Sequence, residues 1–430
     1  PEVAREDGMV QIEPLLPGLG MQMQLVGREA ARDLLEATQW FDRPVDAFVQ
    51  MQWRHNTRVL SARPKAISEK GDALGGTTVQ NGKRGISDRI RHEFYRPAYR
   101  TVLRASNMRW RNGKNSAGLV DNLIVVEANR YGLGQDARLL ADMLRDLGQS
   151  ALIAGHKDRS RFLRKKVARR IIHLERVFPS WFGAGLETTL IPNPEWFRPR
   201  LVRQLRHVDR ILAKTEHGAD VFSRLGPPVF QLGFASVNCL KPEITKDWSA
   251  FFHLAGGSFL KGTEEVLSAW RRHPEWPQLT LMQSAGEEWK DLPPNVTLIR
   301  QHLPTQALRE IQNSHGVHLC PSRAEGWGHY IHEAQSCGAI VVTTDAPPMN
   351  EFVTHRNGYL VAWERKEKRK LGELFFVSQS ALEQSIADIL VRRDDEKAET
   401  GRRARIRYEA TAADFRLAAK KLFYLGRKAP

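Results

Sequence analysis

Two glutamates and two glycines in one short stretch have the types and spacing to bind a phosphorylated ligand. The stretch PSRAEGWGHYIHEAQSCG contains Glu325, Gly326, Trp327, Gly328 and Glu333. Apolar residues before it predict a strand and HYIHEAQSC predicts a helix, so the free amides at the helix start can face an anion. A carboxylate accepts hydrogen bonds from vicinal hydroxyls such as those of a ribose. The combination predicts a nucleotide pocket; a tight turn followed by a solvent-facing glutamate is the alternative.

The stretch PSRAEGWGHYIHEAQSCGAIVV, with seven residues between its two glutamates, resembles the donor-site motif of retaining glycosyltransferases of family 4, which have the GT-B fold. The resemblance extends upstream to HLAGGSFLKGTEEVLSAW and downstream to TTDAPPMNEFVTHRNGYLV. It covers roughly residues 123–362 and implies an α/β fold in which two doubly wound, Rossmann-like domains face a cleft, preceded here by an N-terminal extension.

The resemblance also implies roles for individual residues. Glu325 and Lys261 would be catalytic, and Glu333 would hold the ribose of the donor. The donor site would comprise Gly256, Gly257, Lys261, Arg323, Glu325, Gly326, Trp327, Gly328, Glu333, Asn350 and Glu351. The acceptor side would comprise Gly132, Gly134, Asn193, Glu195 and Lys214. Many family members carry a base where this sequence has Gly256 or Gly257, so we expect backbone amides or Arg323 to replace it.

The activity implied by the resemblance is sugar transfer with retention from a nucleotide diphospho-sugar to a saccharide or lipid-linked saccharide. The leaving diphosphate would take part in proton transfer from the acceptor hydroxyl, and neither a metal nor another cofactor would be needed. We expect a role in the synthesis of cell-surface polysaccharide or lipopolysaccharide. The motifs do not indicate which sugar, base or acceptor is used.

Composition limits the class of protein. The 430 residues suffice for two or three domains, and their net charge of +16 favours an acidic partner. No apolar run approaches the ~20 residues that cross a bilayer, and PEVAREDGMV lacks the shape of a signal peptide. Cys239, Cys320 and Cys337 show neither a disulfide nor a zinc pattern. We therefore expect a cytoplasmic protein.

The first 119 residues precede the region of resemblance. Residues 1–80 are similar to the C-terminal part of glycosyltransferase family 25 and would be a partial remnant without chemistry, since that family's nucleotide-binding start would lie upstream. An extension without a stable fold is the alternative. Residues 81–119 are predicted to be a basic linker, in which Arg96, Arg100 and Arg104 share one helix face.

The rest of the chain alternates strand and helix patterns, which predicts parallel sheets. Residues 120–236 would form an N-terminal acceptor domain that opens with Gly132, Gly134 and Ala137 in a weak GxGxxA pattern. Residues 237–430 would form the donor domain, with C-terminal helices that return to the first domain. Residues 236–248 read as the hinge between them by composition.

Two other functions stay open. A dinucleotide-dependent enzyme would explain the GxGxxA pattern but not the paired glutamates. A nucleic-acid-binding protein would explain the charge, yet the sequence has neither a zinc pattern nor an aromatic RNA motif, so we expect no nucleic-acid partner. The basic run Lys157–Arg170, if helical, would place Leu163 and Val167 on an apolar strip flanked by bases, which predicts peripheral binding to an anionic membrane surface; a solvated face is the alternative.

Overall fold

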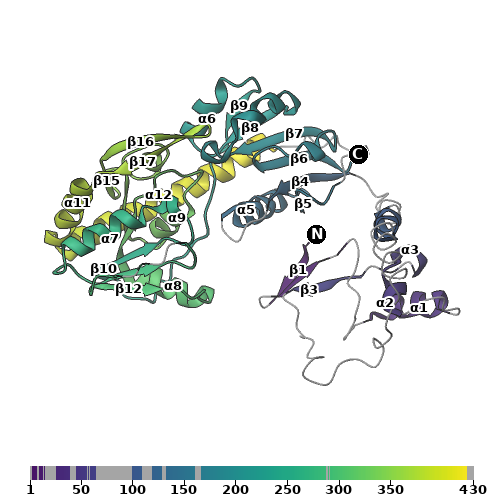
Figure 1. Ribbon diagram of the computed structural model, residues 1–430, viewed down its shortest axis with the longest axis horizontal. Helices are drawn as coiled ribbons and strands as arrows, with labels where there is room; N and C mark the ends of the chain where they lie inside the picture. The colour runs from purple at the N-terminus through teal and green to yellow at the C-terminus, as the bar shows by residue number, and fades with distance from the viewer. Residues whose placement is uncertain are drawn as a thin grey trace, which may run out of the picture. The chain divides into compact units, whose positions relative to one another are not determined.

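The chain forms two compact units, Pro1–Leu119 and Val120–Pro430 (Figure 1). The computed structural model describes residues 2–6, 9–12, 14, 26–38, 45–55, 57, 59–63, 99–108, 119–127, 132–159, 166–286, 289 and 291–423. Each unit has its own secondary structure. Among the helices in these ranges, none combines the length and the apolar character needed to cross a membrane.

The first unit contains a small antiparallel sheet and short helices. Its elements are β1 (Glu2–Glu6), β2 (Met9–Ile12), α1 (Arg28–Ala37), α2 (Val45–Val49), α3 (Gln52–His55), β3 (Ser61–Arg63) and a helical segment over residues 99–108. The buried side chain of Asn107 joins this segment to α3, because it accepts a hydrogen bond from the Gln52 amide at 3.0 Å and donates one to the Gln50 carbonyl at 2.8 Å. Arg100 and Arg104 are exposed on the predicted helix, whereas Arg96 lies outside the described residues.

The second unit begins with a six-stranded parallel sheet in the order β5-β4-β6-β7-β8-β9. Most residues of its central strands are buried on both faces, as in a sheet covered on both sides. The elements are β4 (Val120–Val126), α5 (Gly132–Asp146), β5 (Ala151–Gly155), β6 (Ala168–Glu175), η2 (Pro179–Trp181), β7 (Gly185–Pro192), η3 (Pro194–Trp196), η4 (Pro199–His207), β8 (Arg210–Ala213), α6 (Glu216–Ser223) and β9 (Val229–Gln231).

A second six-stranded parallel sheet follows, in the order β12-β11-β10-β13-β14-β15. Its strands and helices are β10 (Asp247–Leu254), η5 (Phe259–Lys261), α7 (Thr263–Arg272), β11 (Leu279–Met282), β12 (Val296–Ile299), α8 (Thr305–Ser314), β13 (His315–Cys320), α9 (His329–Ser336), β14 (Ile340–Thr344), α10 (Met349–Phe352) and β15 (Tyr359–Val361). The predicted strand, loop and helix around the paired glutamates are confirmed as β13 and α9.

The C-terminal helices follow the second sheet. After the hairpin β16 (Trp363–Arg369) and β17 (Gly372–Val377), which the sequence did not lead us to expect, come α11 (Gln379–Val391) and α12 (Asp394–Leu422). Figure 1 shows α12 running from the second sheet to the first. There Phe415 packs against Phe234 with ring centroids 5.1 Å apart, and Arg210 donates to the Leu422 carbonyl at 2.8 Å.

The basic run is not helical in its C-terminal part, so the apolar strip that a helix would form there is absent from the described residues. Ala168–Glu175 is strand β6, and Arg170 within it is buried, with its Nε 3.2 Å from Oε1 of Glu187. Val167 packs against the apolar core beside this strand. Neighbouring strands on both sides of β6 fix the extended conformation there, which outweighs local helical spacing. Residues 160–165, with Arg164 and Lys165, lie outside the described residues.

Candidate active site

Two loops of the second sheet meet where the paired glutamates begin. The strands β10 and β13 are parallel neighbours, so the loops after them leave the same edge of the sheet. Gly262 has a φ of 68°, and a Cβ at this position would lie 2.2 Å from the carbonyl oxygen of Pro321. Only glycine permits this approach, which brings Lys261 next to the loop that holds Glu325.

Lys261 and Glu325, the two candidate catalytic residues, form an ion pair. Nζ of Lys261 lies 2.6 Å from Oε1 of Glu325, and the ammonium is 3.7 Å from the ring centroid of Tyr330. Ser322 donates a further hydrogen bond to the same carboxylate oxygen. The side chains of the pair are only 19% and 12% exposed, so the charges are held in a largely desolvated position.

The start of α9 offers donors for an anion. Gly328 precedes the helix with a φ of 78°, and in the described part of the chain no acceptor pairs with the backbone amides of residues 326–330. These amides carry the positive end of the helix dipole. We expected the amides of Gly256 and Gly257 to face the donor. The Gly256 amide already donates a hydrogen bond to the Met282 carbonyl at 3.2 Å, whereas the Gly257 amide has no acceptor among the described residues.

Arg323 is held away from this cluster of amides. Its Nη2 lies 2.8 Å from Oε1 of Glu265, and its guanidinium stacks over Phe376 at 4.7 Å. The backbone amide of Arg323 donates to the Leu260 carbonyl at 2.7 Å, which ties the two loops together. Of the two expected substitutes for the missing base, the loop amides therefore fit better than the Arg323 side chain.

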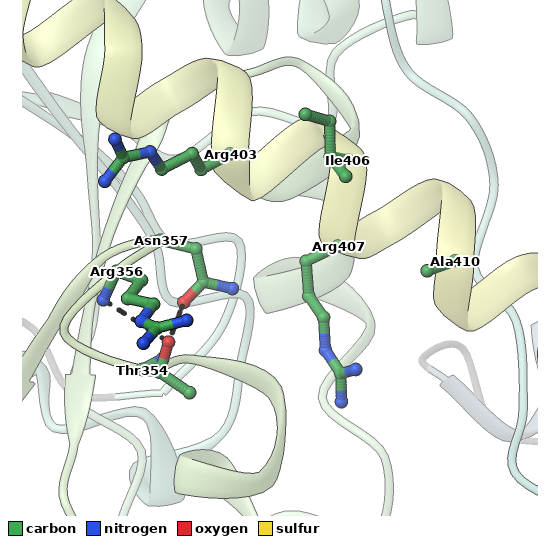
Figure 2. Close-up of a pocket in the computed structure, with 7 residues that line it drawn as sticks. All are labelled: Thr354, Arg356, Asn357, Arg403, Ile406, Arg407 and Ala410. Atoms are coloured by element: carbon green, nitrogen blue, oxygen red, sulfur yellow. Dashed lines mark hydrogen bonds between the residues drawn. The ribbon is translucent and has the colours of Figure 1, made fainter.

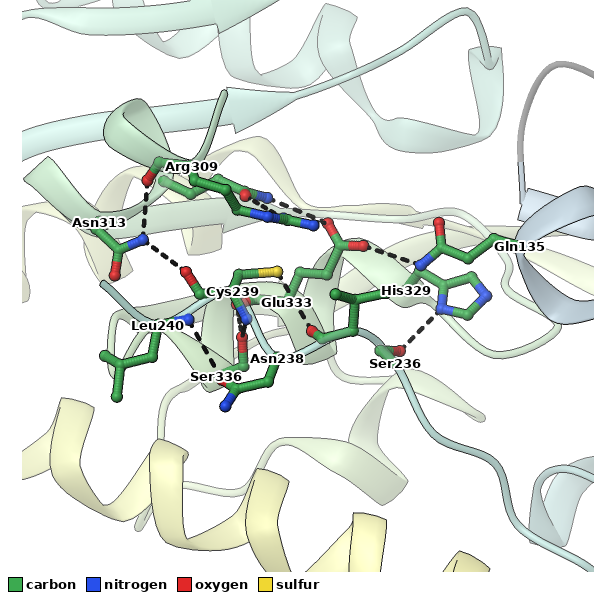
Figure 3. Close-up of polar contacts among 12 residues, drawn as sticks. Gln135, Ser236, Asn238, Cys239, Leu240, Arg309, Asn313, His329, Glu333 and Ser336 are labelled. Carbon is green, nitrogen blue, oxygen red and sulfur yellow. Dashed lines mark hydrogen bonds and ion pairs between the residues drawn. The ribbon is translucent and has the colours of Figure 1, made fainter. Parts of the chain in front are cut away.

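Glu333 lies one turn into α9 and joins three elements (Figure 3). Its Oε1 accepts a hydrogen bond from Gln135 of α5 at 3.2 Å, and its Oε2 accepts one from Gln312 of α8 at 3.1 Å. Arg309 places Nη1 3.7 Å from the same Oε2. The residue is 7% exposed, so its carboxylate is positioned from several sides before any ligand binds.

Trp327 belongs to the core rather than to an open pocket. It is 4% exposed, its ring stacks on His332 with centroids 4.2 Å apart, and its indole nitrogen donates to Oγ of Ser236 at 3.1 Å. What this residue can offer a donor is its backbone amide.

Asn350 and Glu351 also have partners inside the protein. Asn350 donates from its side chain to Asp345 at 3.1 Å. The carboxylate of Glu351 accepts hydrogen bonds from the amides of Glu216 and His217, both at 2.8 Å, and so satisfies the start of α6 beside the first sheet. Burial raises the pKa of Glu351 although these amides favour the charged form.

The first sheet presents Asn193 and Glu195 directly after β7. A Cβ on Gly326 would lie 2.4 Å from Cγ of Asn193, so this glycine lets the two loops touch. Burial, together with the charge of Glu325, raises the pKa of Glu195 to about 7. Glu175 ends the neighbouring strand with a φ of 66°, a strained value for a residue other than glycine.

A chain of buried polar contacts between the two sheets was not predicted. Lys214 lies 2.7 Å and His329 lies 2.6 Å from the carboxylate of Asp136, and His329 also contacts Ser236 at 2.8 Å. Burial alone would raise the pKa of Asp136, but Lys214 and His329 outweigh it and hold the pKa well below its ordinary value. Lys214 is thus fully paired, and Gly132, in the first turn of α5, lies against His329.

The sequence contained a signal for this chain of contacts. Asp136 lies within the GxGxxA pattern at the start of α5, and His329 directly follows the second glycine of the α9 loop. Gly134 also lies in that first helical turn. Polar residues at these two helix starts face the same space between the sheets.

Residues 260–371 match the family described as glycosyl transferases group 1. Alpha-maltose-1-phosphate synthase of Mycolicibacterium smegmatis is 32% identical over 96 residues, which are 22% of this chain and 25% of that protein. The match thus spans a quarter of the length of that relative.

Solved structures resemble the chain in fold at low identity. A glycosyltransferase from Rickettsia africae is 12% identical, with a TM-score of 0.55 over 71% of this chain and 98% of that one. Anabaena HepE in complex with UDP and glucose is 14% identical, with a TM-score of 0.53 over 71% and 100%. Sucrose-phosphate synthase from Thermosynechococcus elongatus is 13% identical, with a TM-score of 0.53 over 70% and 98%. The chain therefore has the GT-B fold, and its residues 260–371 carry a region of the glycosyl transferases group 1 type.

Proposed function

We propose that the protein is a retaining glycosyltransferase that moves a sugar from a nucleotide diphospho-sugar to a saccharide or lipid-linked saccharide. The observation that carries this proposal is the Lys261–Glu325 ion pair beside the free amides of residues 326–330. A cation and several amides there can bind a diphosphate, and the carboxylate can contact the attached sugar. The group 1 match over residues 260–371 covers these groups.

Donor binding would rearrange two contacts. Lys261 would turn from Glu325 toward the diphosphate, leaving the carboxylate free to accept hydrogen bonds from sugar hydroxyls. The ribose hydroxyls would bind Glu333, replacing the hydrogen bond from Gln135. Lys261 would exchange a carboxylate for the diphosphate, and Glu333 would exchange a neutral amide donor for neutral hydroxyls. Glu325 would exchange the ammonium for hydrogen bonds from sugar hydroxyls and would keep the one from Ser322.

In the transfer step, the bond between the anomeric carbon and the diphosphate oxygen breaks, and the acceptor oxygen bonds to that carbon on the same face. The acceptor proton passes to the leaving diphosphate. Lys261 and the α9 amides stabilise the negative charge that develops on the diphosphate; removal of one such donor costs about 10²- to 10³-fold in rate. No residue of this scheme has to bind a metal.

The acceptor would enter from the first sheet, where Asn193 and Glu195 face the loop of Glu325. HepE, crystallised with UDP and glucose, supports a uridine nucleotide as the first donor to try. A place in cell-surface polysaccharide or lipopolysaccharide synthesis at the cytoplasmic face of a membrane is consistent with this acceptor class.

A donor panel tests the proposal. The full chain is incubated with nucleotide diphospho-sugars that differ in base and sugar, with and without lipid-linked saccharides, and released nucleotide is measured by mass spectrometry. At least one donor should release nucleotide, and the rate should fall at least 100-fold in Lys261→Gln. Release that is absent for every donor, or equal in the variant and the wild type, would count against the proposal.

A further inference from the structure

A basic cavity lies between a loop of the second sheet and helix α12 (Figure 2). Its volume is about 590 Å³, within the range of ~300 to 1,000 Å³ typical of small-molecule sites. The lining residues are Thr354, Arg356, Asn357, Arg403, Ile406, Arg407 and Ala410. Three of these seven side chains are guanidinium groups and none is a carboxylate, so the cavity favours an anion.

The cavity is separate from the candidate active site. The loop over residues 354–357 leads into the amino end of β15, whereas the loops with Lys261 and Glu325 leave the carboxyl ends of β10 and β13. Because all strands of this sheet are parallel, these are opposite edges. A ligand in the cavity would therefore bind away from the proposed donor.

The charges of the cavity are incompletely compensated. Arg403 pairs with Glu399 at 2.7 Å, but Glu399 also pairs with Arg402. Arg407 donates to the carbonyl of Glu351 at 3.0 Å, which leaves its positive charge in place. In the described part of the chain no carboxylate forms an ion pair with the exposed side chain of Arg356.

Arg403 and Arg407 lie one helical turn apart on α12, and Arg356 approaches from the facing loop. Figure 2 shows the side chains of Arg403 and Arg407 extending in different directions from the helix, so the three guanidinium groups are spread along the cavity. The loop itself is fixed: Oδ1 of Asn357 accepts hydrogen bonds from the Thr354 amide at 2.6 Å and hydroxyl at 3.0 Å. The conformation of this loop is therefore fixed before a ligand binds.

We propose that this cavity binds a ligand with two linked phosphate groups, a diphosphate. Planar guanidinium groups bind phosphate oxygens in pairs, and three of them exceed what one phosphate needs. Ile406, which is 58% exposed, and Ala410 line the same cavity and give an apolar surface for the organic part of a diphosphate ester. The proposal does not depend on the proposed glycosyl transfer.

Methyl NMR of Ile406 tests this site directly. The full chain, with labelled isoleucine methyl groups, is titrated with inorganic pyrophosphate; Ile406→Val identifies the signal. The Ile406 signal should shift and saturate, and the Arg356→Gln/Arg403→Gln variant should bind at least tenfold more weakly. The matched control Arg416→Gln/Lys420→Gln removes two exposed charges of α12 outside the cavity and should titrate like the wild type.

Equal titrations of the two double variants would overturn the proposal, as would a shift reproduced by sodium chloride at the same ionic strength. A second arm separates a lipid-linked diphosphate from a soluble one, using sedimentation with neutral vesicles that contain or lack a polyprenyl diphosphate. Sedimentation that needs this lipid together with Arg356 and Arg403, and that pyrophosphate reverses, would assign the site to a lipid-linked diphosphate. A saturable Ile406 shift without sedimentation would assign it to a soluble diphosphate.

Discussion

Gln135 and Glu333 are joined by a hydrogen bond of 3.2 Å that runs from α5, beside the first sheet, to α9, beside the second. The glutamate expected to hold the donor's ribose thus already accepts a hydrogen bond from a helix of the first sheet. A donor whose ribose bound this carboxylate would compete with the Gln135 amide, and its binding would then be coupled to the contact between the sheets.

Replacement of Gln135 should therefore strengthen donor binding. Gln135→Ala removes a competitor for Oε1 of Glu333. We expect donor affinity to rise about two- to tenfold, because the donor no longer has to displace a hydrogen bond to a charged group, although water replaces part of that bond in the free protein. Calorimetric titration measures the change. Gln149→Ala, which removes a hydrogen bond to the Phe423 carbonyl, serves as the control. Weaker binding by Gln135→Ala would mean that Gln135 itself contacts the donor.

The raised pKa of Glu195 predicts a stability that falls as pH rises. Folded protein keeps a proton on this carboxyl up to about pH 7, while the unfolded chain releases it near 4.5. The favourable contribution of Glu195 to the free energy of unfolding is complete below pH 4.5. It is lost by about pH 7, and the loss is on the order of 3 kcal/mol. Urea unfolding of wild type and Glu195→Gln at pH 5.0 and 7.5 measures it. Parallel changes in both proteins would contradict the assignment.

Gly326 should tolerate a side chain only if Asn193 is shortened. A Cβ at position 326 would lie 2.4 to 2.6 Å from three atoms of the Asn193 side chain. Gly326→Ala should therefore reduce the rate of donor turnover at least tenfold by displacing the Glu325 loop. The double variant Gly326→Ala/Asn193→Ala should regain part of that loss. Full activity of the single variant would show that the loops separate without cost.

Deletion of residues 1–115 should leave a folded protein. The chain divides after Leu119, and residues 120–430 contain both parallel sheets. We expect the truncated chain to be monodisperse, to unfold cooperatively and to release nucleotide from the donor at the rate of the full chain. A soluble, monodisperse but inactive fragment would show that the first unit contributes to the reaction.

Much of the second unit could be predicted because its local patterns agree with its tertiary structure. The apolar run before Pro321, the glycines of the loop and the helix of HYIHEAQSC all appear as β13, its loop and α9. A strand buried on both faces reads as a short continuous apolar run, and the glycines and proline that follow it mark where it ends. The helical alternative for the basic run does not hold at its end, because pairing with β4 and β7 places Arg170 in a strand.

The sequence named candidate residues for the site but not the contacts between them. Sequence spacing indicated Lys261 and Glu325 but could not show that they bond to each other, because 64 residues separate them. Nor could it show that Glu351 accepts from the start of α6, or that Trp327 lies in the core. Such contacts arise from the packing of two sheets and leave no local pattern. The likeness of residues 1–80 to family 25 stays a prediction.

Glu333 offers the most direct measurement. If its carboxylate binds the ribose diol, Glu333→Ala removes two hydrogen bonds to a charged group, each worth about 1.5 to 3 kcal/mol. Glu383→Ala, which removes a carboxylate of α11 that pairs with Arg272, is the matched control. Both variants are titrated by calorimetry with the nucleotide diphosphate of the donor selected by the panel. We predict at least tenfold weaker binding by Glu333→Ala and unchanged binding by the control; equal affinity of Glu333→Ala and the wild type would contradict the assignment of this helix as the donor site.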